Sequence, residues 1–185
     1  MKKIHFFVVT FIAVLAVSCG NDEAASKLED AKIVDPKSHL LTSIAGIEKK
    51  MHSSPQIDNI IAGQALQLYF EYTTNYPTDP ATPDYLFKSG EIATAIQQYP
   101  QAYSYYKTIC EKHPSYKLIE ESYFLQASVL DNYLNEDEKA RKVYTQLINL
   151  FPNSKYVNDA KAAINNLGKS DEELIKEFQK KNGGK

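Results

Sequence analysis

Apolar residues recur every three or four positions through most of the chain, which places their side chains on one face of an α-helix. Leu40, Ile44 and Ile47 illustrate this spacing in the first third of the sequence. Leu174 and Phe178 illustrate it near the carboxyl end. The pattern therefore predicts a succession of amphipathic helices.

Three prolines divide the pattern into units of nearly equal length, because Pro77, Pro114 and Pro152 lie 37 and 38 residues apart. An alanine stands twelve residues before each proline, and a tyrosine stands eight before it. The alanines and tyrosines are Ala65, Tyr69, Ala102, Tyr106, Ala140 and Tyr144. Their offset of four places both on one helical face, where the alanine admits a neighbouring helix and the ring fills the remaining gap. We expect these six residues in a repeat core, with each proline ending its helix.

Helix-start signals mark the helix that carries Ala140 and predict further helices before and after the repeated ones. Asp35 before a proline is typical of an N-cap, and Asn135 with Glu138 resembles a capping box. Ser170 with Glu173 has the same pattern and predicts a last helix. The chain is therefore expected to be all-α and built from helix–turn–helix pairs.

Helix pairs with this small–aromatic–proline spacing resemble tetratricopeptide repeats (TPR). The resemblance covers about Pro36 to Gly168 and is strongest from Pro83 to Pro152, although each unit exceeds the family's usual length of about 34 residues. It implies a TPR-like solenoid of about three repeats with a C-terminal capping helix. The architecture is similar to that of two groups of bacterial envelope proteins, the lipoprotein of the β-barrel assembly machinery and the cell-division coordinator repeat family.

The amino terminus has the pattern of a secretory signal, with Lys2 and Lys3 before an apolar run from Ile4 to Val17. The run is shorter than the roughly 20 residues of a membrane span. Residues 16–19 resemble a lipobox, which implies acylation of Cys19 and cleavage before it. The alternative is an ordinary signal peptide cut near residue 18 or 20.

These signals predict the order of the segments. Residues 1–18 are expected to be a lipoprotein signal peptide, 19–34 a lipidated flexible tether, 35–181 the repeat domain and 182–185 a disordered tail. Gly20 stands where an aspartate would resemble an inner-membrane retention signal. We therefore expect an outer-membrane lipoprotein held by acyl chains on Cys19, on the periplasmic face rather than the cell surface.

The net charge limits which partners are expected, and the cysteine content indicates the state of Cys110. The formal net charge is −2, and the expected signal peptide contributes only lysines, so the mature chain is more acidic still. Such a balance argues against a nucleic-acid partner, which requires a basic face. Cys110 would remain alone after acylation of Cys19, and we interpret it as a small buried thiol.

The first helix of each pair in such a solenoid lines a concave surface that accepts a peptide or a helix of another protein. Helical register assigns seven residues to this candidate groove: Asp84, Phe87, Glu91, Thr94, Glu120, Tyr123 and Asp131. The alternative for Phe87 and Tyr123 is core packing. The alternative for the acidic residues is a solvated face.

No arrangement typical of catalysis or metal binding is visible, because the histidines share no ligand spacing and no nucleophile motif occurs. We therefore expect no enzyme, no cofactor and no metal. The favoured function is a scaffold that binds other envelope proteins through its concave helical face. The alternative is a surface-exposed lipoprotein that binds a small molecule or a glycan.

Overall fold

The computed structural model describes residues 35–53 and 56–183. The expected signal peptide, the tether and Cys19 lie outside the described residues, as does the end of the tail. The helices are α1 (Pro36–His52), α2 (Asn59–Asn75), α3 (Thr82–Ala95), α4 (Tyr99–Lys112), α5 (Ile119–Asn132), α6 (Asp137–Leu150), α7 (Val157–Asn166) and α8 (Asp171–Asn182). Since the described part contains no strand, the structure confirms the all-α class.

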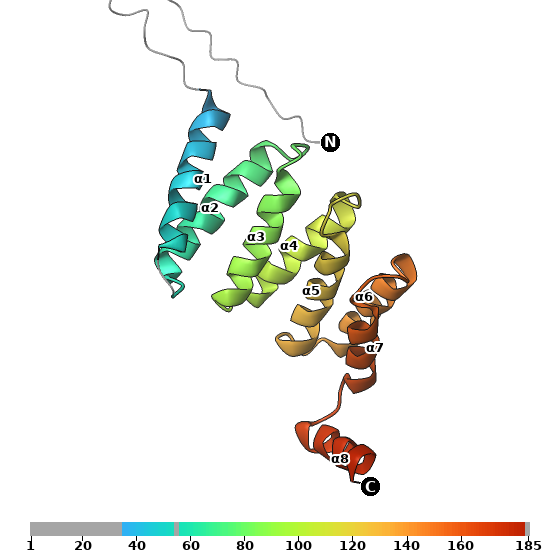
Figure 1. Ribbon diagram of the computed structural model, residues 1–185. Helices are drawn as coiled ribbons and strands as arrows, with labels where there is room; N and C mark the ends of the chain where they lie inside the picture. Colours follow the sequence, from blue (N-terminus) through green and yellow to red (C-terminus); the bar gives the residue numbers. More distant parts are fainter. Residues whose placement is uncertain (1–34, 54–55, 184–185) are drawn as a thin grey trace, which may run out of the picture. The chain divides into compact units, whose positions relative to one another are not determined.

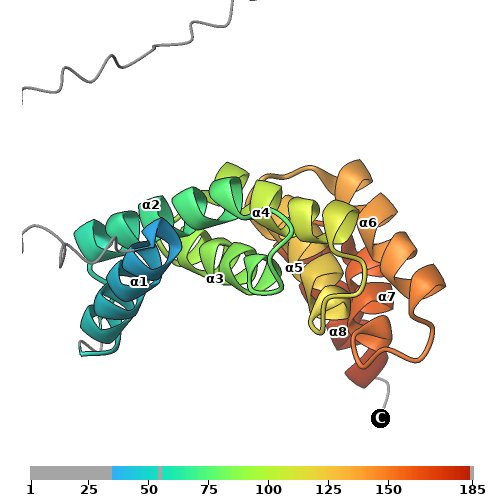
Figure 2. The same ribbon diagram turned by 90° about the horizontal axis from the view of Figure 1, so that it is seen from above.

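From α1 to α7, each helix packs against the next one along the chain (Figure 1). Helices α1, α3 and α5 form one layer, and α2, α4 and α6 form the other (Figure 2). The two layers bend into an arc with the odd-numbered helices on its inner side (Figure 2). The repeating part is therefore a solenoid of three helix pairs, continued by α7.

The three prolines mark three nearly identical turns. Tyr76, His113 and Phe151, which precede the prolines, have φ/ψ of −128°/56°, −129°/57° and −132°/64°. A following proline disfavours the helical conformation at such a residue, which ends the helix there. Each of the three residues also donates its backbone N–H to the carbonyl four residues earlier and accepts a backbone hydrogen bond from the residue three positions later. The prolines, which are nearly equally spaced, thus produce three turns of nearly equal geometry.

The six residues expected in the repeat core are all buried. Ala65, Ala102 and Ala140 are 0% exposed, and the three tyrosines are each 2% exposed. The tyrosine rings fill the space that the short alanine side chains leave between helices. Tyr106 packs especially closely on α3, where Gly90 provides the room for its ring.

Two of the three helix starts that the sequence predicts have the expected capping residues. The Asp35 side chain caps α1, and Ser170 with Glu173 forms a complete capping box on α8. The interpretation of Asn135 is wrong, because Asn135 adopts φ 53° in the turn and α6 has Glu136 at its N-cap without a side-chain hydrogen bond.

Helix α8 begins as expected but makes no extensive contact with the other described helices (Figure 1). Its Ile175 and Phe178 side chains are 55% and 68% exposed. Helix α7, rather than the last helix α8, therefore packs against α6 and covers it. None of the helices in the described ranges combines the length and apolar character that crossing a membrane requires.

Two glycines give a matched test of the helix packing. A Cβ atom at Gly90 would lie 2.6 Å from the Tyr106 ring, whereas a Cβ atom at Gly63 would have no neighbour within 4 Å. We expect Gly90→Ala to destabilise the fold by about 1–3 kcal/mol through overpacking. Gly63→Ala should stabilise it by about 0.5–1 kcal/mol through helix propensity. Urea unfolding measures both, and equal stabilisation by the two substitutions would contradict the packing.

Candidate functional site

The candidate site is the inner side of the arc, where α1, α3 and α5 carry a row of charged side chains. Helix α3 supplies Asp84, Lys88 and Glu91, whose spacing of three and four residues places them along one face. Helix α1 supplies Glu48, and α5 supplies Glu121. The row therefore crosses neighbouring helix pairs, which only stacking brings together.

Glu48 joins α1 to the next two helices. Its Oε1 accepts a hydrogen bond from the Tyr69 hydroxyl at 2.8 Å and one from Lys88 Nζ at 2.6 Å. Burial alone would raise the pKa of Glu48, but these two hydrogen bonds outweigh burial and hold the pKa below its ordinary value. Glu48 is thus an ionised and satisfied group at neutral pH.

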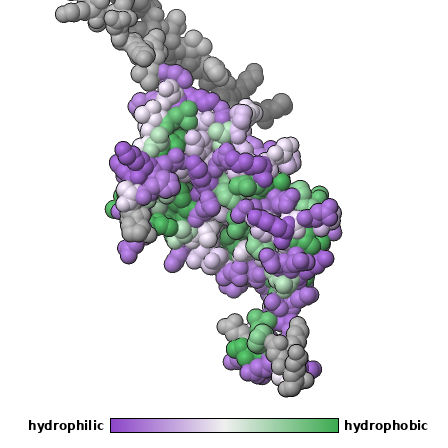
Figure 3. All heavy atoms as spheres, in the orientation of Figure 1, coloured by the Kyte–Doolittle hydropathy of each residue, from purple (hydrophilic) through white to green (hydrophobic). Residues whose placement is uncertain are grey.

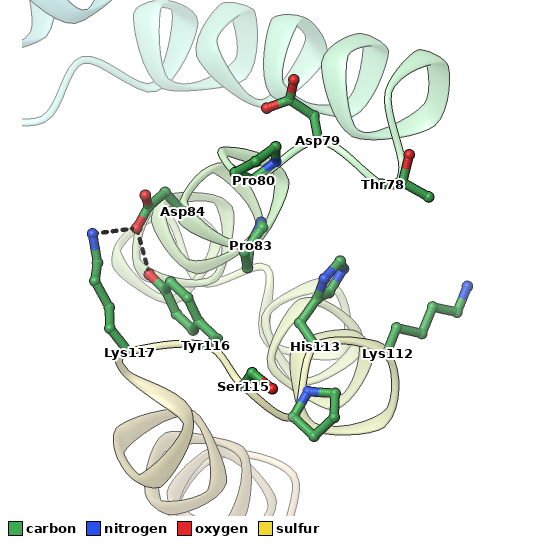
Figure 4. Close-up of a pocket in the computed structure, with 11 residues that line it drawn as sticks. Thr78, Asp79, Pro80, Pro83, Asp84, Lys112, His113, Ser115, Tyr116 and Lys117 are labelled. Atoms are coloured by element: carbon green, nitrogen blue, oxygen red, sulfur yellow. Dashed lines mark hydrogen bonds and ion pairs between the residues drawn. The ribbon is translucent and has the colours of Figure 1, made fainter.

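Asp84 makes the corresponding junction between α3 and the turn before α5. Its Oδ1 accepts from the Tyr116 hydroxyl at 2.8 Å and lies 2.9 Å from Lys117 Nζ. Figure 4 shows both side chains turned toward Asp84 at the edge of a hollow of about 550 Å³. Burial opposes ionisation here too, yet the two donors hold the pKa of Asp84 below its ordinary value.

Glu91 differs from these two carboxylates. It has no hydrogen-bond or ion-pair partner among the described residues, and partial burial followed by repulsion from Glu121 raises its pKa. Glu121 interacts electrostatically with Lys155 and with the Tyr156 hydroxyl. Glu91 is therefore a carboxylate that a cationic group of another molecule would stabilise.

A small hollow adjoins Glu91 between α1 and α3. It has a volume of about 220 Å³. Its lining residues are Glu48, Met51, His52, Tyr69, Lys88, Glu91 and Ile92. The mixture of apolar, acidic and basic side chains suits a side chain of a partner protein better than a small apolar ligand.

Phe87 requires a correction, because the structure places it in the core rather than in the groove. Its side chain is 6% exposed and its ring lies 5.8 Å from that of Tyr106 and 6.1 Å from that of Tyr116. The position one turn after Asp84 on the inner face belongs instead to the exposed Lys88. A register error of one residue along the helix accounts for the difference.

The four other groove candidates are all half-buried. Glu120 and Asp131 are half-buried, and Asp131 accepts a long hydrogen bond of 3.4 Å from the Tyr144 hydroxyl. Thr94 donates its hydroxyl to the Gly90 carbonyl. Tyr123 is half-buried, and its ring packs against that of Phe151 at 5.8 Å. Glu91 remains the candidate most available to a partner.

Sequence reasoning missed Glu48, Lys88, Tyr116, Lys117 and Glu121. No local signal identifies the Lys88 pair or the Tyr116 bond, since their partners lie 40 and 32 residues away in sequence. Glu121 is adjacent to the candidate Glu120. The helical register assumed from the sequence assigned Glu120, rather than Glu121, to the inner face.

The described residues hold no group of three or more side chains placed to bind a metal ion. Burial raises the pKa of the Cys110 thiol to about 12, which keeps the sulfur protonated at neutral pH. Cys110 is therefore not an activated nucleophile.

The unpaired carboxylate provides a pH test. Because its pKa is raised in the fold, protonated Glu91 contributes stability that is present below its unfolded pKa and lost as pH rises through the folded value. We expect Glu91→Gln to raise the free energy of unfolding at pH 7 and to have little effect at pH 3. Glu121→Gln should lower the pKa of Glu91 in an NMR titration, whereas Glu138→Gln on α6 should leave it unchanged. A Glu91 pKa at or below that of an unfolded peptide would contradict the site geometry.

Comparison with known proteins agrees with the geometry of the central helix pairs. Residues 84–116 and 121–154 each match the model of the tetratricopeptide repeat family. These stretches contain α3 with α4 and α5 with α6, apart from the first residues of α3 and α5. A search of curated proteins gave no match to the chain. The described chain is thus an all-α, TPR-like solenoid that contains two recognisable tetratricopeptide repeats, an architecture typical of protein–protein interaction scaffolds.

Proposed function

We propose that the protein is a lipid-anchored scaffold of the bacterial cell envelope and binds another envelope protein on its concave face. Glu91 carries the proposal, because an exposed and unpaired carboxylate on the inner face of a repeat stack has no role in holding the stack together. A partner that presents a basic side chain beside apolar ones would pair with Glu91 and fill the adjoining hollow.

The anchor belongs to the same proposal and rests on the sequence of residues 1–19. One acyl chain holds a protein only weakly, whereas the two or three chains of a processed lipoprotein hold it stably. Cys19 would then fix the protein in the outer membrane, with the repeats on the periplasmic side. Outer-membrane assembly, secretion and cell-wall coordination are the processes that such a scaffold would serve.

A second candidate, the binding of a small molecule or glycan, is favoured by one feature of the outer layer. A hollow of about 620 Å³ lies between α2 and α4. Its lining includes seven hydroxyl-bearing threonine, serine and tyrosine side chains, together with the exposed Phe70. Aromatic faces and hydroxyls suit a sugar. Saccharide binding lost in Phe70→Ala and kept in Glu91→Gln would favour this candidate over the scaffold.

Partner binding is tested by crosslinking in intact cells followed by mass spectrometry. We expect Glu91→Gln combined with Glu121→Gln to reduce recovery of the crosslinked partner by about tenfold or more, as for loss of charge pairs at an interface. Glu138→Gln, on the outer layer, is the matched control and should retain the partner. Equal recovery with both variants would place the partner elsewhere on the molecule.

Anchoring is tested at the two cysteines. Cys19→Ala should abolish incorporation of labelled palmitate and release the protein from the membrane fraction, because no acyl chain remains. Cys110→Ser changes the other cysteine of the chain and should leave both measurements unaltered. Wild-type protein recovered in the soluble fraction without label would instead indicate an ordinary signal peptide.

A further inference from the structure

Two uncovered apolar surfaces lie at the two ends of the helix order. The first is on α8, where Ile175 and Phe178 lie one turn apart on the same side and are more than half exposed. Figure 3 shows hydrophobic side chains gathered on this helix. A helix of this length is marginally stable alone in water, so its apolar face requires a covering surface.

The second surface is a groove between α1 and α2, with a volume of about 400 Å³. Its lining residues are Ser43, Gly46, Ile47, Lys50, Gln64, Gln67 and Leu68. All of them belong to α1 or α2, and none comes from α3, which packs against α2. The groove therefore lies at the α1 end of the described solenoid, where no other described helix lines it.

Gly46 makes room in this groove. A glycine inside a helix costs about 1 kcal/mol relative to alanine, and in α3 the close packing of Tyr106 explains Gly90. A Cβ atom at Gly46 would have no neighbour within 4 Å, so nothing in the described chain makes the same use of Gly46. The space beside Gly46 is open, so a side chain of another molecule can approach the helix backbone there.

The charges beside the two surfaces are opposite. Lys50 lines the groove and has no carboxylate partner among the described residues. Glu172 lies in the first turn of α8, one turn before Ile175, and is likewise exposed without a cationic partner in the described ranges. Docking of the two apolar surfaces can therefore bring these charges together without burying either one unpaired.

We propose that α8 of one copy docks in the α1–α2 groove of a second copy, with Ile175 and Phe178 against the half-buried Leu68 and the space above Gly46. The occupant is a second copy because α2 to α7 stack between a chain's own groove and its own α8. Each copy offers one α8 and one groove, so the contact is head-to-tail and can continue into chains or close into rings. The surfaces are small, and the association is accordingly weak and reversible.

Analytical ultracentrifugation of the purified full chain over a range of concentrations tests the proposal. Wild-type protein should form dimers and larger species as concentration rises. Phe178→Ala should weaken this association by about tenfold or more, as expected for loss of a buried aromatic anchor. Phe70→Ala removes another ring that is more than half exposed, on α2 outside the groove, and should associate as wild type does.

A second pair of variants separates docking from folding. Gly46→Leu should keep or raise the melting temperature and abolish association by filling the groove, whereas Gly63→Leu, on α2 outside the groove lining, should leave association intact. A mixture of Gly46→Leu with Phe178→Ala retains one good α8 and one good groove, and should stop at a heterodimer.

Three results would overturn the proposal. They are a wild-type protein that stays monomeric at every concentration, a mixture that forms no heterodimer, and α8-dependent binding to phospholipid vesicles without any self-association. None of these measurements depends on Glu91 or Cys19, so they are independent of the proposed scaffold and anchor.

Discussion

The solenoid depends on one contact repeated in each helix pair, in which a tyrosine ring of the second helix enters the space between that helix and its neighbours. Tyr69, Tyr106 and Tyr144 are nearly solvent-free, and an alanine one turn earlier lets the helices approach closely enough to enclose each ring. A smaller side chain would leave a cavity, and a larger residue at the alanine would push the helices apart. The curvature of the stack, and therefore its inner surface, follows from this spacing.

The same tyrosines connect the core to the inner surface. Tyr69 donates its hydroxyl to Glu48 and Tyr144 donates more weakly to Asp131, so two core rings end at carboxylates on the odd-numbered helices. Among the described residues, Tyr106 has no such hydrogen bond to a carboxylate, and Glu91, whose charge acts on Tyr106, has no hydrogen-bond partner. Glu91 thus lies unsatisfied in one of the two matched repeats, and this contrast with Glu48 and Asp131 identifies it as a candidate contact.

The described solenoid also has two ends. An apolar surface at an end must either be covered or stay exposed to other molecules. At the carboxyl end α7 covers α6, while α8 leaves its apolar side open. At the other end the groove at Gly46 remains open between α1 and α2. The ends and the inner face are separate surfaces, so self-association and partner binding can occur on the same molecule without competing for residues.

The sequence alone determined the helices, their pairing and the six core residues, because proline turns and a period of three to four residues are properties of neighbouring positions. It also determined the start of α8, since a capping box is local. Tertiary structure decided that Phe87 is buried while Lys88 faces outward, a distinction of one residue that depends on how α3 is rotated against α4 and α5. Tertiary structure alone also decided the contacts of Lys88 with Glu48 and of Tyr116 with Asp84, because residues 40 and 32 positions apart meet only after the helices have stacked.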